Sequence, residues 1–262
     1  MMSIQSIYFQ GLKFSIFNDE EIENYIIEVI NNKSNIICYG YSIGILPTIK
    51  SFPEILYNAN TFDLMVTDGR PLYLLMKIFS APIKSNISIP ELVLKVLDIC
   101  NKYSLSIFLL GSKEATNLKA ITNIKVKYKN IKSVHGFHGF WEISEEHKII
   151  EILKQKSPNV LLIALPSPYK ESLASKIKKY SVANIIIPCG GMVDVIADEF
   201  KLTPTFIKKI GFAWLFRLIQ QPKRIKLTVK FLIAFFIILL KLIINKLINS
   251  KKSAFLQYLN LE

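Results

Sequence analysis

Acidic, hydroxyl and glycine residues gather in four short segments of this chain, and together they could bind phosphate and move a proton. Asp68 stands beside a glycine, and its carboxylate could take the proton from an attacking hydroxyl group. The other segments, residues 111–113, 166–171 and 189–194, combine glycine or serine with polar side chains. Exposed backbone N–H groups in such segments attract anions. Each segment alone could be a simple turn, as could Asp68, but the set favours a nucleotide-type site.

The three arginines are a second chemical signal. They are Arg70, Arg217 and Arg224, in a chain with 33 lysines and arginines altogether. A planar guanidinium binds phosphate or carboxylate through two parallel hydrogen bonds, whereas a lysine ammonium cannot. In so lysine-rich a chain we interpret the arginines as anion-binding residues. The alternative is that they are ordinary residues of a solvated face.

Six apolar runs and the helical stretches between them would position these groups. The runs are residues 36–41, 64–67, 106–110, 132–136, 160–165 and 185–188. This alternation predicts a Rossmann-like α/β fold, a parallel sheet flanked by helices, over residues 1–200. Each of the four polar segments directly follows one of the runs. Because ligands bind at the carboxyl ends of such strands, we expect the segments to meet in one site.

The C-terminal part, residues 201–262, differs from the rest of the chain. Residues 200–261 hold twelve lysines and arginines and no acidic residue, which accounts for nearly all of the net charge of +13. Residues 231–240 are an unbroken apolar run. At about 100° per residue, Lys226, Lys230, Lys241 and Lys251 fall on one side of a helix.

This pattern predicts a basic, amphipathic helical appendage that lies on an anionic membrane surface. So wide an apolar face is not what nucleic acid requires, so we expect no nucleic-acid partner. The alternatives are a helix in the core, a helix in a homo-oligomer interface, and a true membrane span. The ten-residue run is shorter than the ~20 residues that a span needs.

Cysteine and histidine usage points away from metal and disulfide chemistry. Cys38, Cys100 and Cys189 lie far apart in apolar runs, and the chain has three histidines without metal-ligand spacing. We therefore expect no metal, no cofactor and a reducing, cytoplasmic compartment. The N-terminus lacks a basic segment followed by an apolar one, so we expect no secretory signal.

Five segments, in order, resemble motifs of the WecG/TagA/CpsF glycosyltransferases, which form glycosyltransferase family 26. IFLLGS resembles the family's fLLGG, HGFHGFW its GyhGYF, and SPYKE its GxPxQE. CGGMVDVIAD resembles VGGxFDxxxG, and GFAWLFRLIQQPKR is very close to GLEWLyRLxxEPxR. Upstream, VTDG resembles the family's pDG strand end. The ordered set covers more than half of the chain.

The resemblance implies an inverting, metal-independent enzyme that moves a sugar from a UDP-sugar to a polyprenyl-diphosphate-linked acceptor in bacterial surface polysaccharide synthesis. It implies that Asp68 is the general base and that Arg217 and Arg224, with which we group Arg70, hold a diphosphate. The expected location is peripheral, on the cytoplasmic face of the cell membrane. The donor-binding residues that we expect are Gly111, Ser112, Ser167, Lys170, Glu171, Gly190, Gly191 and Asp194.

Several departures from the family pattern stand in the same segments. Lys170 replaces the glutamine of GxPxQE, which could be neutral or could change the donor sugar to one that carries a carboxylate. The donor sugar could thus be of the N-acetylmannosamine type, a uronic acid or a hexose. KSNISIPEL stands where the family has ERxxGxDL, ICYGYSIG replaces an asparagine-containing segment, and Ala213 replaces the glutamate of GLEW. The alternative function is therefore a catalytically degenerate membrane-bound scaffold that binds the same ligands.

Overall fold

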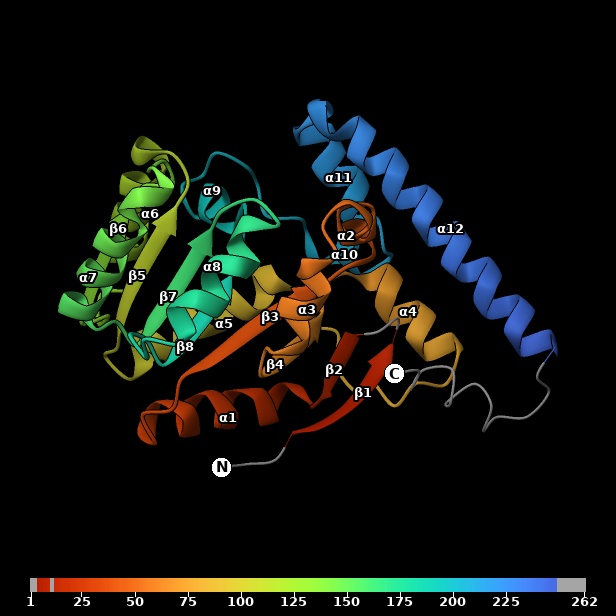
Figure 1. Cartoon of the computed structure of the whole chain (residues 1–262), viewed down its shortest axis with the longest axis horizontal. Helices are drawn as coiled ribbons and strands as arrows, with labels where there is room; N and C mark the ends of the chain where they lie inside the picture. Colours follow the sequence, from red (N-terminus) through yellow and green to blue (C-terminus); the bar gives the residue numbers. More distant parts are fainter. Residues whose placement is uncertain (1–3, 10–11, 249–262) are drawn as a thin grey trace.

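A six-stranded parallel sheet forms the centre of the molecule in the computed structural model, which describes residues 4–9 and 12–248 (Figure 1). The strands follow the order β4-β3-β8-β7-β5-β6 across the sheet. They are β3 (Ile36–Tyr41), β4 (Leu64–Thr67), β5 (Ser106–Gly111), β6 (Ser133–Phe137), β7 (Val160–Ala164) and β8 (Ile185–Pro188). Each agrees with one of the six apolar runs to within one residue at either end. The predicted Rossmann-like α/β fold is confirmed.

Helices cover both faces of this sheet (Figure 1). Those on the first face are α1 (Asp19–Asn31), α5 (Ile89–Lys102), α6 (Glu114–Lys127) and α9 (Met192–Ile196). Those on the second face are α2 (Leu46–Ser51), α3 (Glu54–Asn60), α4 (Arg70–Ile78), α7 (Glu146–Lys156) and α8 (Tyr169–Lys178). The sheet therefore separates two hydrophobic cores.

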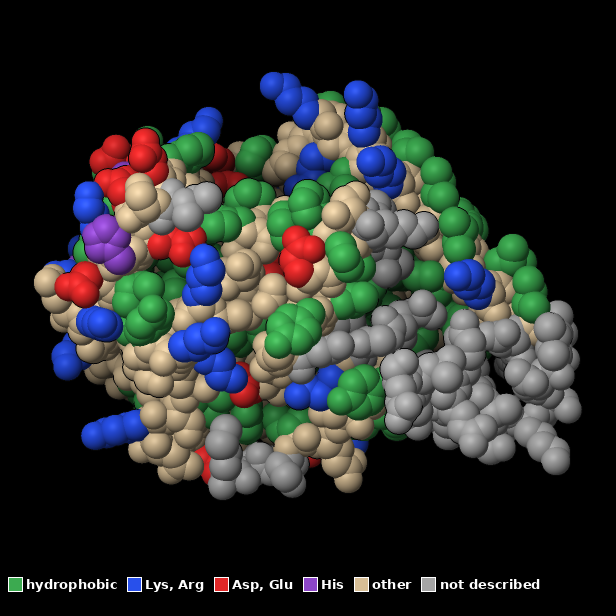
Figure 2. All heavy atoms as spheres, in the orientation of Figure 1, with side chains coloured by type: hydrophobic (Ala, Val, Ile, Leu, Met, Phe, Trp, Pro, Cys, Tyr) green, Lys and Arg blue, Asp and Glu red, His purple; other side chains and the backbone are tan. Residues whose placement is uncertain are grey.

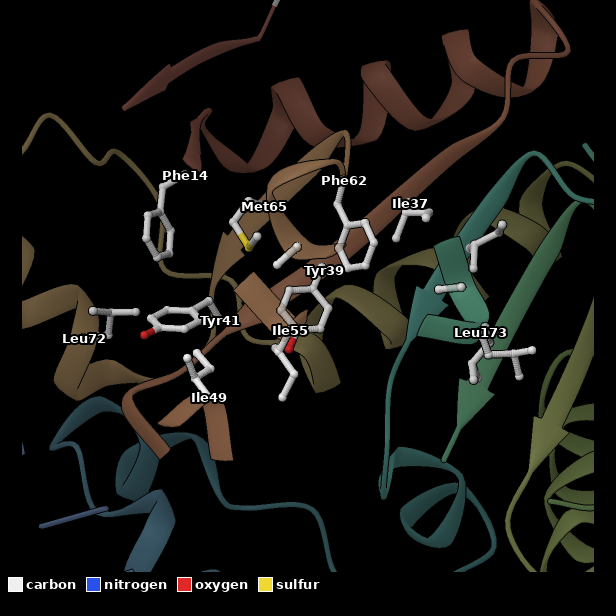
Figure 3. Packing of buried hydrophobic residues seen from close by; sticks show 14 of the residues in the cluster. Phe14, Ile37, Tyr39, Tyr41, Ile49, Ile55, Phe62, Met65, Leu72 and Leu173 are labelled. Carbon is white, nitrogen blue, oxygen red and sulfur yellow. The ribbon is translucent and has the colours of Figure 1, made fainter. Parts of the chain in front are cut away.

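Strand β3 shows why its sequence is apolar throughout. Successive side chains of a strand point to opposite faces of the sheet. Ile36 and Cys38 enter the first core, whereas Tyr39 and Tyr41 enter the second. Figure 3 shows the two tyrosine rings packed among side chains from α2, α3 and α4. A strand buried on both sides reads as a continuous apolar run, and this made it recognisable.

An N-terminal hairpin lies outside the predicted pattern. Strands β1 (Gln5–Phe9) and β2 (Leu12–Ile16) pair antiparallel and form a separate two-stranded sheet. The hairpin is attached to the edge strand β4, where the backbone N–H of Met65 donates to Ser15 Oγ at 3.1 Å. Phe14 of the hairpin packs against Tyr41, the last residue of β3, with ring centroids 5.8 Å apart, so the hairpin supports this edge of the sheet.

Within residues 201–248, the described portion of the C-terminal part, the helices are α10 (Thr205–Lys209), α11 (Ala213–Gln220) and α12 (Ile225–Ile248), with the short 3₁₀ turn η3 (Pro222–Arg224) before α12. Helix α12 packs against α2 and the 3₁₀ turn η1 (Ile43–Ile45). Ile238 and Leu242 of α12 are buried in the second core. The alternative of a core helix therefore holds for one side of α12.

The other side of α12 is exposed and largely apolar. Ile233 is 54% exposed and Phe236 is 61% exposed, so this helix is apolar on both sides rather than sharply amphipathic. Lys226, Lys230 and Lys241 lie on the exposed side, as the periodicity predicted, and Figure 2 shows hydrophobic side chains and lysines mixed along this edge. Lys251 and Lys252 lie outside the described residues. By length and composition the helical stretch Pro222–Ile244 could also cross a membrane.

Candidate active site

A cavity of about 920 Å³ opens at the carboxyl ends of the strands. Its walls come from the loops after β3, β4, β5, β7 and β8, and from the C-terminal helices α10, α11 and α12. The predicted site residues that line it are Asp68, Arg70, Ser112, Ser167, Lys170, Gly190, Gly191, Asp194, Arg217 and Arg224. Segments that are far apart in the sequence thus meet in one site.

Two of the predicted donor-binding residues lie behind this wall. Gly111 has a φ of +115°, and a Cβ on it would lie 2.4 Å from the carbonyl oxygen of Ala164. Only glycine fits there, so Gly111 serves the close packing of β5 against β7. Glu171 is fully buried, with no exposed surface, and contacts the cavity through its neighbour Lys170.

Asp68 is held at the edge strand with one carboxylate oxygen engaged. The backbone N–H of Ile89 donates to its Oδ1 at 3.1 Å, and its own backbone N–H donates to the Tyr41 carbonyl at 2.9 Å. Gly40 makes room for this arrangement, since a Cβ there would lie 2.2 Å from the Ile89 side chain. These contacts fix the orientation of the carboxylate, and its second oxygen is left for a ligand.

Ser112 and Asp194 join the loops after β5 and β8. Ser112 Oγ donates to Asp194 Oδ1 at 2.7 Å, which ties the two loops together. Burial raises the pKa of the Asp194 carboxyl, while the bond from Ser112 opposes that rise. Next to Asp194, Gly190 has a φ of +53° and is open to the cavity. The hydroxyl of Ser112, the carboxylate of Asp194 and the open space at Gly190 suit the hydroxyls and phosphates of a nucleotide.

A buried polar cluster stands behind the middle of the cavity wall. Glu171 Oε1 accepts hydrogen bonds from Tyr39 Oη at 2.8 Å and from Ser167 Oγ at 2.7 Å. Lys170 Nζ lies 3.4 Å from the same oxygen, and only 16% of the lysine side chain is exposed. The ammonium also lies 5.1 Å from the centre of the Tyr39 ring. Lys170 is therefore a fixed cation in the cavity wall rather than a mobile surface lysine.

The arginines lie on the side of the cavity formed by the C-terminal helices and α4. Arg217 and Arg224 both line the cavity, and burial, followed by the charge of Arg217, lowers the pKa of Arg224. Arg70 stacks on Tyr73 with its guanidinium carbon 5.0 Å from the ring centre, and its buried Nε has no hydrogen-bond partner. None of the three arginines forms an ion pair with a carboxylate of the described chain.

Sequence reasoning missed several residues of this site. Asn86 lines the cavity, and its Oδ1 is buried without a partner. Lys208 of α10 also lines it and donates to Glu91 Oε1 at 3.2 Å, which fastens the C-terminal helices to the start of α5. Asn86 and Glu91 both belong to the segment that departs from the family's ERxxGxDL. That departure was the signal that could have drawn attention to them.

Strand order spreads the site along the sheet. Asp68 follows β4 at one edge, whereas Ser112 follows β5, four strands away. At about 4.8 Å between strands, the two loops start about 19 Å apart. Lys170 follows β7 yet reaches Tyr39 of β3, so it lies between them. An elongated ligand could therefore extend from Ser112 and Asp194, past Lys170, to Asp68.

Comparison with known proteins decides the family. The family model described as "Glycosyl transferase WecG/TagA/CpsF family" matches residues 7–252 of the 262 residues. The chain belongs to the WecG/TagA/CpsF glycosyltransferase family. The resemblance inferred from the motifs is thereby confirmed, and the match includes α12 as well as the sheet.

Curated relatives within this family are distant in sequence. The Bacillus subtilis (strain 168) protein named N-acetylglucosaminyldiphosphoundecaprenol N-acetyl-beta-D-mannosaminyltransferase is 23% identical over 184 residues, 66% of this chain and 71% of the relative. Proteins of the same name from Bacillus spizizenii (strain ATCC 23059 / NRRL B-14472 / W23) and Staphylococcus aureus (strain MW2) are 21% and 23% identical. They align over 62% and 63% of this chain, and over 62% and 65% of their own lengths.

A metal site is not evident in the part of the chain that the structure describes. Within residues 4–9 and 12–248, no three His, Cys, Asp or Glu side chains are grouped so as to hold a metal ion. Cys38, Cys100 and Cys189 are buried free thiols. Cations rather than carboxylate clusters dominate the WecG/TagA/CpsF-family cavity described here, whose basic lining residues are Arg70, Lys170, Lys201, Lys208, Lys209, Arg217 and Arg224.

Proposed function

We propose that this chain is an inverting glycosyltransferase that moves a sugar from a UDP-sugar to a polyprenyl-diphosphate-linked acceptor in bacterial surface polysaccharide synthesis. The observation that carries the proposal is the order of groups along the cavity. Nucleotide-type groups at Ser112 and Asp194 lie at one end, and the acid Asp68 lies near the other, with arginines that form no ion pair among the described residues. Both family membership and the names of the relatives support this reading.

The proposed reaction uses Asp68 as the general base. Its carboxylate takes the proton of the acceptor hydroxyl as the oxygen attacks the anomeric carbon, while the bond from that carbon to the donor diphosphate breaks. Attack from the side opposite the leaving group inverts the configuration. The Ile89 N–H bond to Oδ1 holds the base in one orientation, which avoids reorganisation during the reaction.

The proposed binding residues divide between the two substrates. Donor-binding residues in the cavity wall are Ser112, Ser167, Lys170, Gly190, Gly191 and Asp194, supported from behind by Gly111 and Glu171. The acceptor diphosphate is assigned to Arg70, Arg217 and Arg224, because these guanidinium groups have no carboxylate partner among the described residues. We further propose that these fixed cations, rather than a metal ion, neutralise the two diphosphates.

The C-terminal part, residues 201–262, is proposed to place this site at a membrane. Helix α12 exposes apolar side chains and lysines on one side, while its residues Leu227, Thr228 and Phe231 line the cavity. A lipid-linked acceptor could thus reach the cavity from the surface to which α12 binds. We propose a peripheral location on the cytoplasmic face of the cell membrane. The alternative is that a second copy of the chain, rather than the membrane, covers the exposed apolar side of α12.

A degenerate scaffold is the second candidate, and the departures from the family pattern favour it. Asn86 stands in the segment where the family carries an arginine, and Lys170 replaces a glutamine. Incubating the protein with bacterial membranes and a panel of UDP-sugars, followed by mass spectrometry of the lipid-linked products, separates the two. A new lipid-linked sugar supports the enzyme. Binding of UDP-sugar without any product supports the scaffold.

A further inference from the structure

Lys170 is the cation at the centre of the cavity. It follows β7, and its ammonium reaches the ring of Tyr39 on β3, so it crosses over the end of β8, which lies between those strands. The residues at that end are Cys189, Gly190 and Gly191, all in the cavity wall. The charge of Lys170 opposes the burial that raises the pKa of the Cys189 thiol to about 12, which agrees with this placement.

Contacts from β3 and α8 hold the ammonium in place, and the loop after β7 helps to orient the carboxylate beside it. Glu171, at the start of α8, is fully buried. Its Oε1 accepts hydrogen bonds from the hydroxyl of Tyr39 on β3 and from the hydroxyl of Ser167 in the loop after β7. Lys170 Nζ lies 3.4 Å from the same carboxylate oxygen. A buried carboxylate is stabilised by a cation beside it, and Lys170 supplies that cation.

The ammonium of Lys170 has more N–H donors than its contacts within the protein require. An ammonium has three N–H donors, and the described structure gives Lys170 one carboxylate neighbour and one aromatic ring. Since the side chain lines the cavity, the remaining donors are available to a ligand there. The position is intermediate between the Ser112–Asp194 pair and Asp68, where the charged part of a nucleotide donor would have to lie.

We infer that Lys170 binds the diphosphate of the nucleotide donor and stabilises the departing nucleoside diphosphate. This inference rests on the proposed function and specifies one residue that this chain does not share with the family motif. As the bond between the anomeric carbon and the β-phosphate oxygen breaks, its electron pair passes to that oxygen. The negative charge on the diphosphate rises by one, while the acceptor proton goes to Asp68. A cation fixed beforehand stabilises this charge without reorganising.

Binding measurements with UDP and uridine test the inference without requiring turnover. In titration calorimetry, Lys170→Gln should weaken UDP binding by about 10–100-fold, the range for hydrogen bonds to charged groups, and leave uridine binding within about twofold. Lys176→Gln is the matched control. Lys176 lies on the same helix and pairs with Glu146 at 2.9 Å, but its side chain is 51% exposed and does not line the cavity.

Folding is checked by thermal unfolding of every variant. Should Lys170→Gln unfold because Glu171 is left without its cation, the double variant Lys170→Gln/Glu171→Gln removes both charges, and its UDP binding is expected to be equally weak. Unchanged UDP affinity in a folded Lys170 variant overturns the inference. If the variant keeps its affinity for UDP but loses affinity for a UDP-hexuronate, the inference is also overturned, because the cation then binds the carboxylate of the sugar. Failure of the wild-type protein to bind UDP would instead refute the proposed function.

Discussion

Replacing Asp68 by asparagine isolates the proton-transfer step. Asparagine keeps an oxygen at the Oδ1 position, so it can still accept the 3.1 Å hydrogen bond from the Ile89 N–H. The backbone bond to Tyr41 is also untouched. The side chain should therefore keep its orientation, while a neutral NH2 group that cannot accept a proton replaces the second oxygen.

The expected cost is the usual contribution of general-base catalysis. Removing the base should lower the rate of sugar transfer by about 10²–10⁴-fold. At about 1.36 kcal/mol per tenfold, this is about 2.7–5.4 kcal/mol of activation free energy. Donor binding should change little, because Ser112 follows β5, four strand positions from β4, and Asp194 follows β8, two positions from β4.

Initial rates of lipid-linked product formation, measured at saturating donor, give this ratio directly. UDP binding and thermal unfolding of the same variant show whether the site is intact. Asp98→Asn is a matched control, since Asp98 is an exposed carboxylate on α5 and does not line the cavity. Turnover by Asp68→Asn equal to that of the control would remove Asp68 from the mechanism.

Four further predictions follow from the site and the helices. Arg217→Lys and Arg224→Lys keep the charge but lose the two-pronged contact, and should each weaken diphosphate-lipid binding by about 1–3 kcal/mol; normal acceptor affinity would refute their role. Ile233→Asp should lower sedimentation with anionic vesicles by about tenfold or more, and unchanged sedimentation would mean that this side of α12 faces protein. Gly111→Ala should lower the free energy of unfolding by about 1–3 kcal/mol in denaturant titrations, because the added Cβ would clash with the backbone carbonyl of Ala164. Wild-type stability of this variant would contradict that clash. Burial raises the pKa of the Asp194 carboxyl in the folded state above its value in the unfolded chain. Between these two pKa values the folded state binds more protons, so the free energy of unfolding falls as pH rises. In Asp194→Asn that component of the pH dependence of unfolding should vanish, and an unaltered curve would show that another group causes it.

Apolar patterning predicted the sheet because its strands are buried on both faces. Runs such as residues 36–41 are continuous in the sequence for that reason. The hairpin β1–β2 has one exposed side and weaker patterning, so it was not predicted. Strand order leaves no mark on local sequence, so the separation of Ser112 from Asp68 became visible only in the fold.

The candidate site was predictable where a strand end carries an unusual residue, as at Asp68 and Asp194. Asn86 was not predictable in this way, because it lies in the loop between α4 and α5 and reaches the cavity only through tertiary packing. The periodicity of α12 identified its lysines but not its inward side. Ile238 and Leu242 look like any other apolar residues of the helix until α2 is packed against them.

Under the proposed function, the position of α12 makes membrane binding and acceptor binding thermodynamically reciprocal. One helix contributes Leu227 and Phe231 to the cavity and presents Ile233 and Phe236 to the outside. A bilayer that stabilises one arrangement of this helix also stabilises the corresponding arrangement of the cavity wall. If the acceptor binds better to that same arrangement, the acceptor raises the affinity for the bilayer by the factor by which the bilayer raises the affinity for the acceptor. Dwell time on the bilayer should therefore lengthen when acceptor lipid is present, so the protein would accumulate on those membranes that hold its substrate.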